Sequence, residues 1–292
     1  MRDFLRDKGT IIRRVIIVLL VCLIVYEAYN IYIEEHERSL AVSEYDSIEE
    51  AAVSGDTGHD TPDGNGWDGE RSGNVVSADG AGSVQVGGYP DLTVDYDLLK
   101  KQNSDYIGWL YWKFDDAGDR NDFEISYPVV LEQARDEYLH KTFKGQVNSA
   151  GCIFMDLDSI PSFDGYSDFL FGHNMRNGTM FGSMDNIYRS ADKEAISRTP
   201  QYVYVYTKDA ILQYVVFEYE LTNSGNEAVY RIISDEDDYD TYVKRLKKLG
   251  NYKCPVDIDF EKRPELLNLS TCSGSSGTNR RLVVHCVKVG NI

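Results

Sequence analysis

The feature that most constrains the fold is a series of short β-rich runs between residues 106 and 289. Each run is rich in Val, Ile, Leu, Tyr and Phe and is bounded by turn residues, a pattern typical of strands. Many short strands in succession favour a closed, antiparallel-rich barrel or a sandwich. We therefore expect a mainly β domain with eight strands. The runs are 106–114, 127–132, 152–157, 168–173, 202–206, 211–221, 266–272 and 281–289.

Three segments between or before these runs are expected to be accessory helices: 91–101, 179–197 and 234–249. The last carries the clearest signals. Ser234 is a candidate N-cap, acidic residues fill the first turn, basic residues fill the last turn, and Gly250 ends the segment.

The N-terminus has the pattern of a membrane anchor. Residues 1–14 contain five basic residues, and residues 15–33 are mostly apolar. A helix of roughly 20 apolar residues crosses a bilayer, and the basic flank favours the cytoplasmic side. No small-residue cleavage site follows the apolar run. We therefore expect an uncleaved, single-pass signal anchor in the cell membrane, with the rest of the chain outside; the alternative is a cleaved signal peptide.

Residues 34–88 are expected to link this anchor to the domain. The stretch 34–53 has the composition of a short helix, whereas 54–88 is dominated by Gly, Asp, Ser, Asn and Thr. A segment with so few apolar residues cannot form a core and indicates a flexible stalk. The compact domain is thus predicted over 89–292. Within it, the acidic loop 115–124 lacks EF-hand spacing and is expected to be a solvated surface loop.

Charge and cysteine usage exclude several classes of function. The formal net charge of −18 disfavours nucleic acid as a partner, because a phosphate backbone requires a basic surface. The five cysteines form no CxxC motif, so neither a zinc site nor a disulfide scaffold is expected. Cys152 and Cys286 lie inside apolar runs and are expected to be buried. No metal and no cofactor are predicted.

Cys272 stands out because it ends an apolar run and precedes a Ser/Gly-rich loop, in NLSTCSGSSGTNRRLVVHC. A thiol attacks as a thiolate, which partial exposure and a nearby cation favour. If the flanking strands pair antiparallel, the start of the second lies beside the end of the first. Arg280 or Arg281 would then lie near the thiol, but not equally, because successive strand residues face opposite sides.

His173 is the best candidate for a general acid/base. It ends its own apolar run in DFLFGHNMRNG, where a turn follows. His285 lies four residues beyond Arg281, about 13 Å further along a strand, which is too far to serve Cys272. His140 is expected on a helix face.

These residues carry a resemblance to a known family. LSTC followed by an arginine at the head of the next strand, together with FGHNMRNGTMFGSM, resembles a sortase. YPVVLEQARDEYLHKTF, SAGCIFMD and the helix before the cysteine strand are similar to the class B branch. The resemblance covers the chain from Tyr89 to its end. It implies an eight-stranded sortase-like β-barrel with accessory helices, on the outer membrane face of a Gram-positive bacterium.

The family's activity, as the resemblance implies it, is cysteine transpeptidation. The enzyme cleaves a C-terminal sorting signal after Thr through a thioacyl intermediate and joins the surface protein to an amine of a cell-wall precursor or a pilin. Class B members cut signals resembling NPQTN or (S/N)PxTG. Cys272 matches the nucleophile, His173 the general acid/base, and Arg281 the arginine that directly precedes the apolar strand, with Arg280 as the alternative.

Candidate substrate contacts follow from the same resemblance. Ser270 and Thr271 precede the nucleophile at the strand end. Arg280 is a further candidate, and so is Arg135, which occupies a region where the family often has an asparagine that is absent here.

Two other interpretations remain open at this stage. A papain-like cysteine peptidase would use the same chemistry with water as acceptor, but its cysteine usually lies on a helix and precedes the histidine; here His173 comes 99 residues before Cys272. A non-enzymatic, surface-binding barrel predicts that Cys272 is buried and inert.

Overall fold

The computed structural model describes residues 2–55, 74–76, 83–85, 90–114, 122–189, 199–273 and 278–292, with side chains described from Arg13 onward except in 74–76 and 83–85. Most of the predicted stalk 54–88 and of the acidic loop 115–124 lies outside these residues. So do the end of the predicted helix 179–197 and most of the Ser/Gly loop after Cys272.

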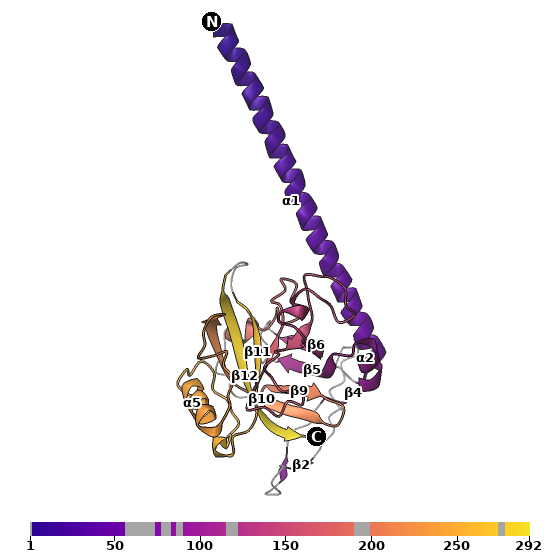
Figure 1. The fold of residues 1–292 in the computed structure, drawn as a ribbon, viewed down its shortest axis with the longest axis vertical. Helices are drawn as coiled ribbons and strands as arrows, with labels where there is room; N and C mark the ends of the chain where they lie inside the picture. Colours follow the sequence, from indigo (N-terminus) through magenta and orange to yellow (C-terminus); the bar gives the residue numbers. More distant parts are fainter. Residues whose placement is uncertain are drawn as a thin grey trace.

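Eight strands close into a barrel in the order β10-β12-β11-β8-β7-β6-β5-β9, which confirms the predicted architecture (Figure 1). Every predicted run overlaps one of them. The strands are β5 (Tyr106–Phe114), β6 (Phe123–Leu131), β7 (Ile153–Met155), β8 (Ser167–Phe171), β9 (Tyr202–Tyr206), β10 (Ile211–Asn223), β11 (Leu266–Cys272) and β12 (Arg280–Asn291).

Two of the eight strand pairings are parallel, and they decide which strand ends meet. β6 pairs parallel with β7, and β8 pairs parallel with β11, whereas β11 pairs antiparallel with β12. The C-terminal ends of β8 and β11 and the start of β12 therefore lie at the same edge of the barrel.

Strand β11 is buried on both faces, which explains its continuous apolar sequence. Leu267 and Leu269 point into the barrel core, whereas Leu266 belongs to a second cluster on the outer face. Burying a leucine side chain contributes roughly 1.5–3 kcal/mol, so these contacts hold the strand firmly up to its exposed last residue, Cys272.

The outer cluster is formed by α5 (Glu236–Leu246), which packs through Tyr239, Tyr242, Val243 and Leu246 against the outer faces of β11 and β12. The helix was predicted, but its cap differs. Asp235 has extended backbone and its carboxylate accepts a hydrogen bond from the Asp238 amide at 2.9 Å, so it takes the capping position expected for Ser234.

The remaining elements are short. They are β1 (Val53–Gly55), which pairs with β4 (Leu92–Val94); the two-stranded pair β2 (Asn74–Val76) and β3 (Ser83–Gln85); α2 (Tyr96–Gln102); α3 (Asn186–Arg189); and two 3-10 turns, η1 (Glu137–Leu139) and η2 (Phe260–Lys262). α2 lies within the predicted segment 91–101 to one residue, and α3 is the described part of the predicted helix 179–197.

Helix α1 (Arg2–Ala52) projects from the barrel as one continuous rod (Figure 1). It contains a stretch of mean hydropathy 2.2 that is long enough to cross a membrane and is unburied. Its apolar side chains from Val15 to Tyr32 are exposed, as expected of a segment that faces lipid.

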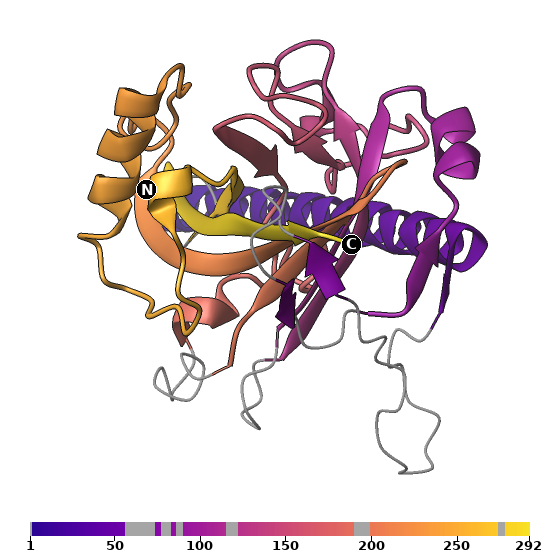
Figure 2. The ribbon, with the colours of Figure 1, turned by 90° about the horizontal axis from the view of Figure 1, so that it is seen from below.

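The C-terminal part of α1 packs on the domain, which was not expected from its sequence. Tyr45, Ile48 and Ala52 are buried, and the Tyr45 hydroxyl donates a 2.6 Å hydrogen bond to the Gly151 carbonyl. The predicted domain start at residue 89 does not include these contacts. They arise because the segment 34–53 carries small and aromatic residues on one helix face, which its overall polar composition conceals. Figures 1 and 2 show this end of α1 and helix α5 on opposite sides of the barrel.

Candidate active site

Three predicted residues meet at the barrel edge described above. Cys272 is the last residue of β11, Arg281 is the second residue of β12, and His173 lies two residues beyond the end of β8. All three line a single cavity of about 490 Å³. The cavity lies on the outer face of the barrel and reaches the loop after β10.

The register between β11 and β12 distinguishes the two arginines. Cys272 lies directly opposite Arg281, and Arg281 in turn pairs with Thr222 of β10. Arg281 is half-buried and lines the cavity. Arg280 is exposed, pairs with Asn223, and is absent from the described residues that line the cavity.

The thiol-bearing strand end is exposed but anchored. Cys272 is exposed, whereas Cys152 and Cys286 are buried. The Asn174 side-chain amide donates a 2.6 Å hydrogen bond to the Cys272 carbonyl, so the chain that follows β8 holds the end of β11. An exposed Cys272 contradicts the expectation of the non-enzymatic interpretation, and a strand-borne Cys272 is unlike the helix-borne cysteine of a papain-like peptidase.

His173 is held by a backbone carbonyl on the cavity wall. Its Nε2 lies 2.6 Å from the Leu139 oxygen. Because a carbonyl oxygen only accepts, Nε2 carries the proton of this bond, and Nδ1 is the nitrogen left for proton transfer. The neighbouring His140 ring stacks on His173, with centroids 5.7 Å apart.

The surroundings of His173 disfavour its charged form. Burial lowers the pKa of His173; the hydrogen bond to Leu139 opposes this, while the charges of His140 and Arg281 act in the same direction as burial. A histidine with a depressed pKa gives up its proton readily, which suits an acid that must protonate a departing amine.

Ser270 and Thr271 differ in their orientation although both line the cavity. Ser270 shares the outer face with Cys272, and its hydroxyl lies 2.8 Å from that of Tyr230. Thr271 is buried and donates a 2.8 Å hydrogen bond to the Gly172 carbonyl. Thr271 therefore joins the ends of β11 and β8.

The cavity has an aromatic side and an acidic side. Phe169 and Phe171 stack at 6.1 Å, and Tyr230 packs on Phe169 at 5.5 Å. Arg135 also lines the cavity; it is largely exposed, and its guanidinium is 3.7 Å from the Asp158 carboxylate. The acidic lining residues are Glu132, Asp136, Asp156 and Asp158.

Comparison with known proteins identifies the family. The family model described as "Sortase domain" matches residues 121–289, more than half of the chain. The chain belongs to the sortase family. The predicted relationship is therefore confirmed.

The curated relatives of this sortase are class B enzymes by name. Sortase B of Listeria monocytogenes is 27% identical over 176 residues, which cover 60% of this chain and 65% of the relative, so the match spans slightly less than two thirds of that protein. Sortase B of Staphylococcus aureus is 23% identical over 190 residues, which cover 65% of this chain and 72% of the relative.

Solved structures support the fold of this sortase. Sortase B of Clostridium perfringens is 26% identical with a TM-score of 0.54, and the match covers 66% of this chain and 98% of that one. Sortase B of B. anthracis, in complex with AAEK1, is 21% identical with a TM-score of 0.58, and the match covers 89% of this chain and 99% of that one.

Several residues of this sortase's site could not be found from the sequence. The Leu139 carbonyl that holds His173 is a backbone atom, which residue type cannot reveal. His140, expected on a helix, instead follows the short turn η1 and stacks on His173. Tyr230 lies on a loop without a motif. His285, excluded by distance, is indeed opposite Asn268 rather than Cys272.

Proposed function

We propose that this sortase is a cysteine transpeptidase that cleaves a C-terminal sorting signal after Thr and transfers the surface protein to an amine of the cell wall or of a pilin. One observation carries the proposal: the Cys272 thiol, the Arg281 guanidinium and the His173 ring line a single cavity at one barrel edge. The order and residue types match the family's sequence motifs.

The first half-reaction forms a thioacyl enzyme. The Cys272 thiolate attacks the Thr carbonyl carbon, a C–S bond forms, and the scissile C–N bond breaks. The electron pair of that bond goes to the departing nitrogen, which takes a proton from His173. Nδ1 of His173 is the nitrogen that carries this proton, because Nε2 is bonded to Leu139.

The second half-reaction transfers the acyl group. The acceptor amine attacks the thioester carbon, a C–N bond forms, and Cys272 leaves as a thiolate. His173 takes the proton that the amine loses, which restores the starting state. Protons therefore balance over the cycle without a third ionisable residue.

Arg281 is assigned to stabilising charge. Both half-reactions pass through a tetrahedral oxyanion at the Thr carbonyl, and a preorganised cationic donor lowers its energy. The position of Arg281 opposite Cys272 supports this role. Its guanidinium currently donates a 3.0 Å hydrogen bond to the Arg280 carbonyl, so some of its remaining N–H groups are available for substrate.

The substrate and acceptor follow from chemistry and from relatives. Structures of the S. aureus enzyme are described as a sortase B–substrate complex and as sortase B complexed with triglycine. For this chain we assign the signal peptide to the cavity, with Ser270, Thr271 and Arg135 as contacts. Arg280 lies outside the cavity lining and is a weaker candidate than at the sequence level.

The same proposal includes a membrane location. Residues 1–14 would stay in the cytoplasm, 15–33 would cross the membrane once, and the catalytic domain would lie outside. The exposed apolar segment of α1 supports this topology. The part of the predicted linker that is described, 34–55, continues as helix and joins the catalytic unit rather than a flexible stalk.

A peptide assay tests the proposal. The full chain in detergent micelles is incubated with pentapeptides resembling NPQTN and SPxTG, with and without triglycine as acceptor, and products are read by mass spectrometry. We expect cleavage after Thr and a triglycine-linked product. Absence of both from the whole panel, or equal turnover by Cys272→Ala, would contradict the proposal.

A further inference from the structure

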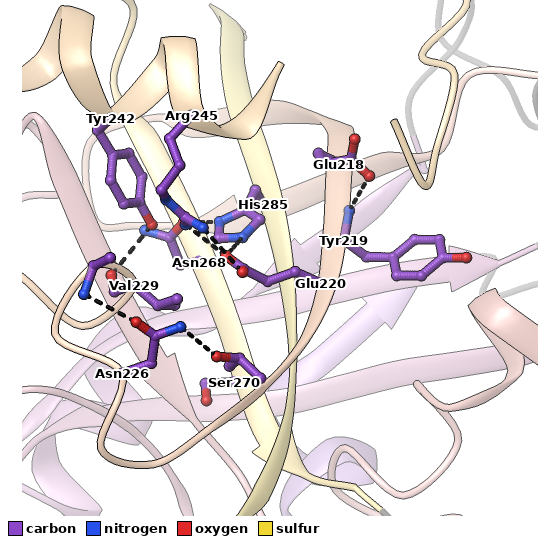
Figure 3. Close-up of polar contacts among 12 residues, drawn as sticks. Glu218, Tyr219, Glu220, Asn226, Val229, Tyr242, Arg245, Asn268, Ser270 and His285 are labelled. Carbon is purple, nitrogen blue, oxygen red and sulfur yellow. Dashed lines mark hydrogen bonds and ion pairs between the residues drawn. The ribbon is translucent and has the colours of Figure 1, made fainter. Parts of the chain in front are cut away.

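A group of polar side chains that the proposed reaction does not use is buried beneath α5. It comprises Glu220 of β10, Asn268 of β11, His285 of β12 and Arg245 of α5 (Figure 3). Asn268 and His285 are completely buried. Buried polar groups are costly unless each finds a partner, so the arrangement of donors and acceptors here is informative.

His285 sits on the middle strand and bonds to both neighbours. Its Nε2 lies 3.0 Å from Glu220 Oε1, and its Nδ1 lies 2.6 Å from Asn268 Oδ1. The ring therefore bridges β10 and β11 across β12.

The Asn268 amide is oriented by its other contacts. Its Nδ2 donates to the Asp168 carbonyl at 3.0 Å and to Ser167 Oγ at 2.8 Å. A backbone carbonyl only accepts, so nitrogen must face Asp168 and oxygen must face His285. Because Oδ1 is an acceptor, Nδ1 of His285 has to carry a proton.

Glu220 is an ionised acceptor. Arg245 donates two hydrogen bonds to its carboxylate, at 2.6 and 3.0 Å. Burial raises the pKa of Glu220, but the hydrogen bonds and charges of His285 and Arg245 outweigh it and lower the pKa to about 2. Nε2 of His285 therefore faces a carboxylate and also has to carry a proton.

Other groups around the ring act in opposite directions. Burial lowers the pKa of His285, and so does the Arg245 charge, whereas the bond to Glu220 raises it. Tyr242 packs edge-on at 6.1 Å, and the Glu218 carboxylate is occupied by the amides of Tyr219, Asn251 and Tyr252. Deprotonation would set a ring lone pair against an oxygen at 2.6 or 3.0 Å, so the observed geometry requires the proton.

The cluster shares strands with the active site. Asn268 lies four residues before Cys272, and His285 four residues after Arg281, on the same outer face. That separation is about 13 Å along each strand. Tyr242 also donates a 3.3 Å hydrogen bond to the Val229 carbonyl, next to the cavity residue Tyr230.

We propose that His285 is held as an imidazolium between Glu220 and Asn268, and that it is a positioning residue that keeps Cys272 opposite Arg281. It acts through strands β11 and β12 and not on the substrate. The positioning role rests on the proposed function, whereas the protonation state does not.

Nitrogen NMR of the full chain, labelled with ¹⁵N-histidine in detergent micelles, tests the protonation state. The His285 signals are assigned by their loss in His285→Gln. At pH 7.5 we expect both ring nitrogens to be protonated in the wild type, and a neutral ring in Glu220→Gln. A neutral His285 in the wild type would overturn the proposal.

Peptide kinetics test the positioning role. Glu220→Gln is expected to lower kcat on the order of tenfold, within the range for residues that act through neighbours, while KM changes less than twofold. The matched control is Glu236→Gln, which removes an exposed carboxylate paired with Arg263 at 3.0 Å and should leave both constants unchanged.

The outcomes are separable. A Glu220→Gln protein with wild-type kcat would overturn the positioning role, as would an equal loss in Glu236→Gln. If Glu220→Gln does not fold, Glu220→Asp provides the test, because it keeps the charge but withdraws it from His285; wild-type kcat there would also contradict the proposal. The NMR measurement needs no substrate, so failure of the transpeptidase assay would not be mistaken for failure here.

Discussion

Cys272 and Arg281 lie directly opposite each other in the antiparallel ladder of β11 and β12, so that one register fixes both the thiol and its cation. Arg280, one residue earlier, is exposed to solvent. A shift of a single residue would exchange the two arginines, which makes their comparison a direct test of the site.

We expect Arg281→Lys to lose most peptide cleavage and Arg280→Lys to lose little. Lysine keeps the charge but not the planar set of donors, and loss of a main oxyanion donor costs about 3–4 kcal/mol. The measurement is kcat/KM for peptide cleavage by each variant. A reversed result would assign the role to Arg280, and mild effects in both would remove arginine from the mechanism.

The pH profile should respond to His140. Its charge is one of the causes that lower the pKa of His173. His140→Phe keeps a stacked ring but removes the charge, so the pKa of His173 should rise and the imidazolium should persist to higher pH. We expect the alkaline limb of kcat/KM to move to higher pH. The control His36→Phe, on exposed α1, should not move it; a shift to lower pH in His140→Phe would contradict the assignment.

The docked end of α1 should stabilise the domain. Tyr45 is buried and donates a hydrogen bond to Gly151, so Tyr45→Ala should lower the free energy of unfolding by about 3–5 kcal/mol. Tyr32→Ala, on the exposed part of the same helix, is the control. Chemical denaturation also compares chains that lack 1–33 or 1–85; equal stability of the two would show that the docked segment contributes nothing.

Alkylation should distinguish the four cysteines beyond the apolar span. Cys272 is exposed, Cys254 is half-buried, and Cys152 and Cys286 are buried. Burial raises the pKa of Cys152 to about 12, which suppresses its thiolate at neutral pH. Peptide mapping after brief iodoacetamide treatment should find Cys272 modified first. Faster modification of Cys152 or Cys286 would mean that the strand end is not the reactive position.

The strands and the meeting of Cys272, His173 and Arg281 were predictable because they depend on local signals. Apolar runs bounded by turn residues identify strands, and a strand end identifies an edge of the barrel. Alternation along β12 separated Arg281 from Arg280. The packed end of α1 was not predictable in this way, because its few buried residues, such as Tyr45 and Ile48, are diluted by charged neighbours on the solvent side.

Contacts between distant segments were also beyond the sequence. Nothing local links His173 to the Leu139 carbonyl, 34 residues away. Likewise, the bonds of His285 to Glu220 and Asn268 depend on the strand order β10-β12-β11, in which chain neighbours are not all sheet neighbours. Such partners become visible only when the sheet closes.

The central claim is that Cys272 forms a thioester with the signal peptide, and intact-protein mass spectrometry tests it most directly. The full chain is mixed with a cleaved pentapeptide in the absence of an amine acceptor and quenched in acid. We predict an adduct of the acyl fragment on Cys272 that hydroxylamine removes and that Cys272→Ala does not form. Peptide cleavage that proceeds without such an adduct, and at the same rate in Cys272→Ala, would contradict the account.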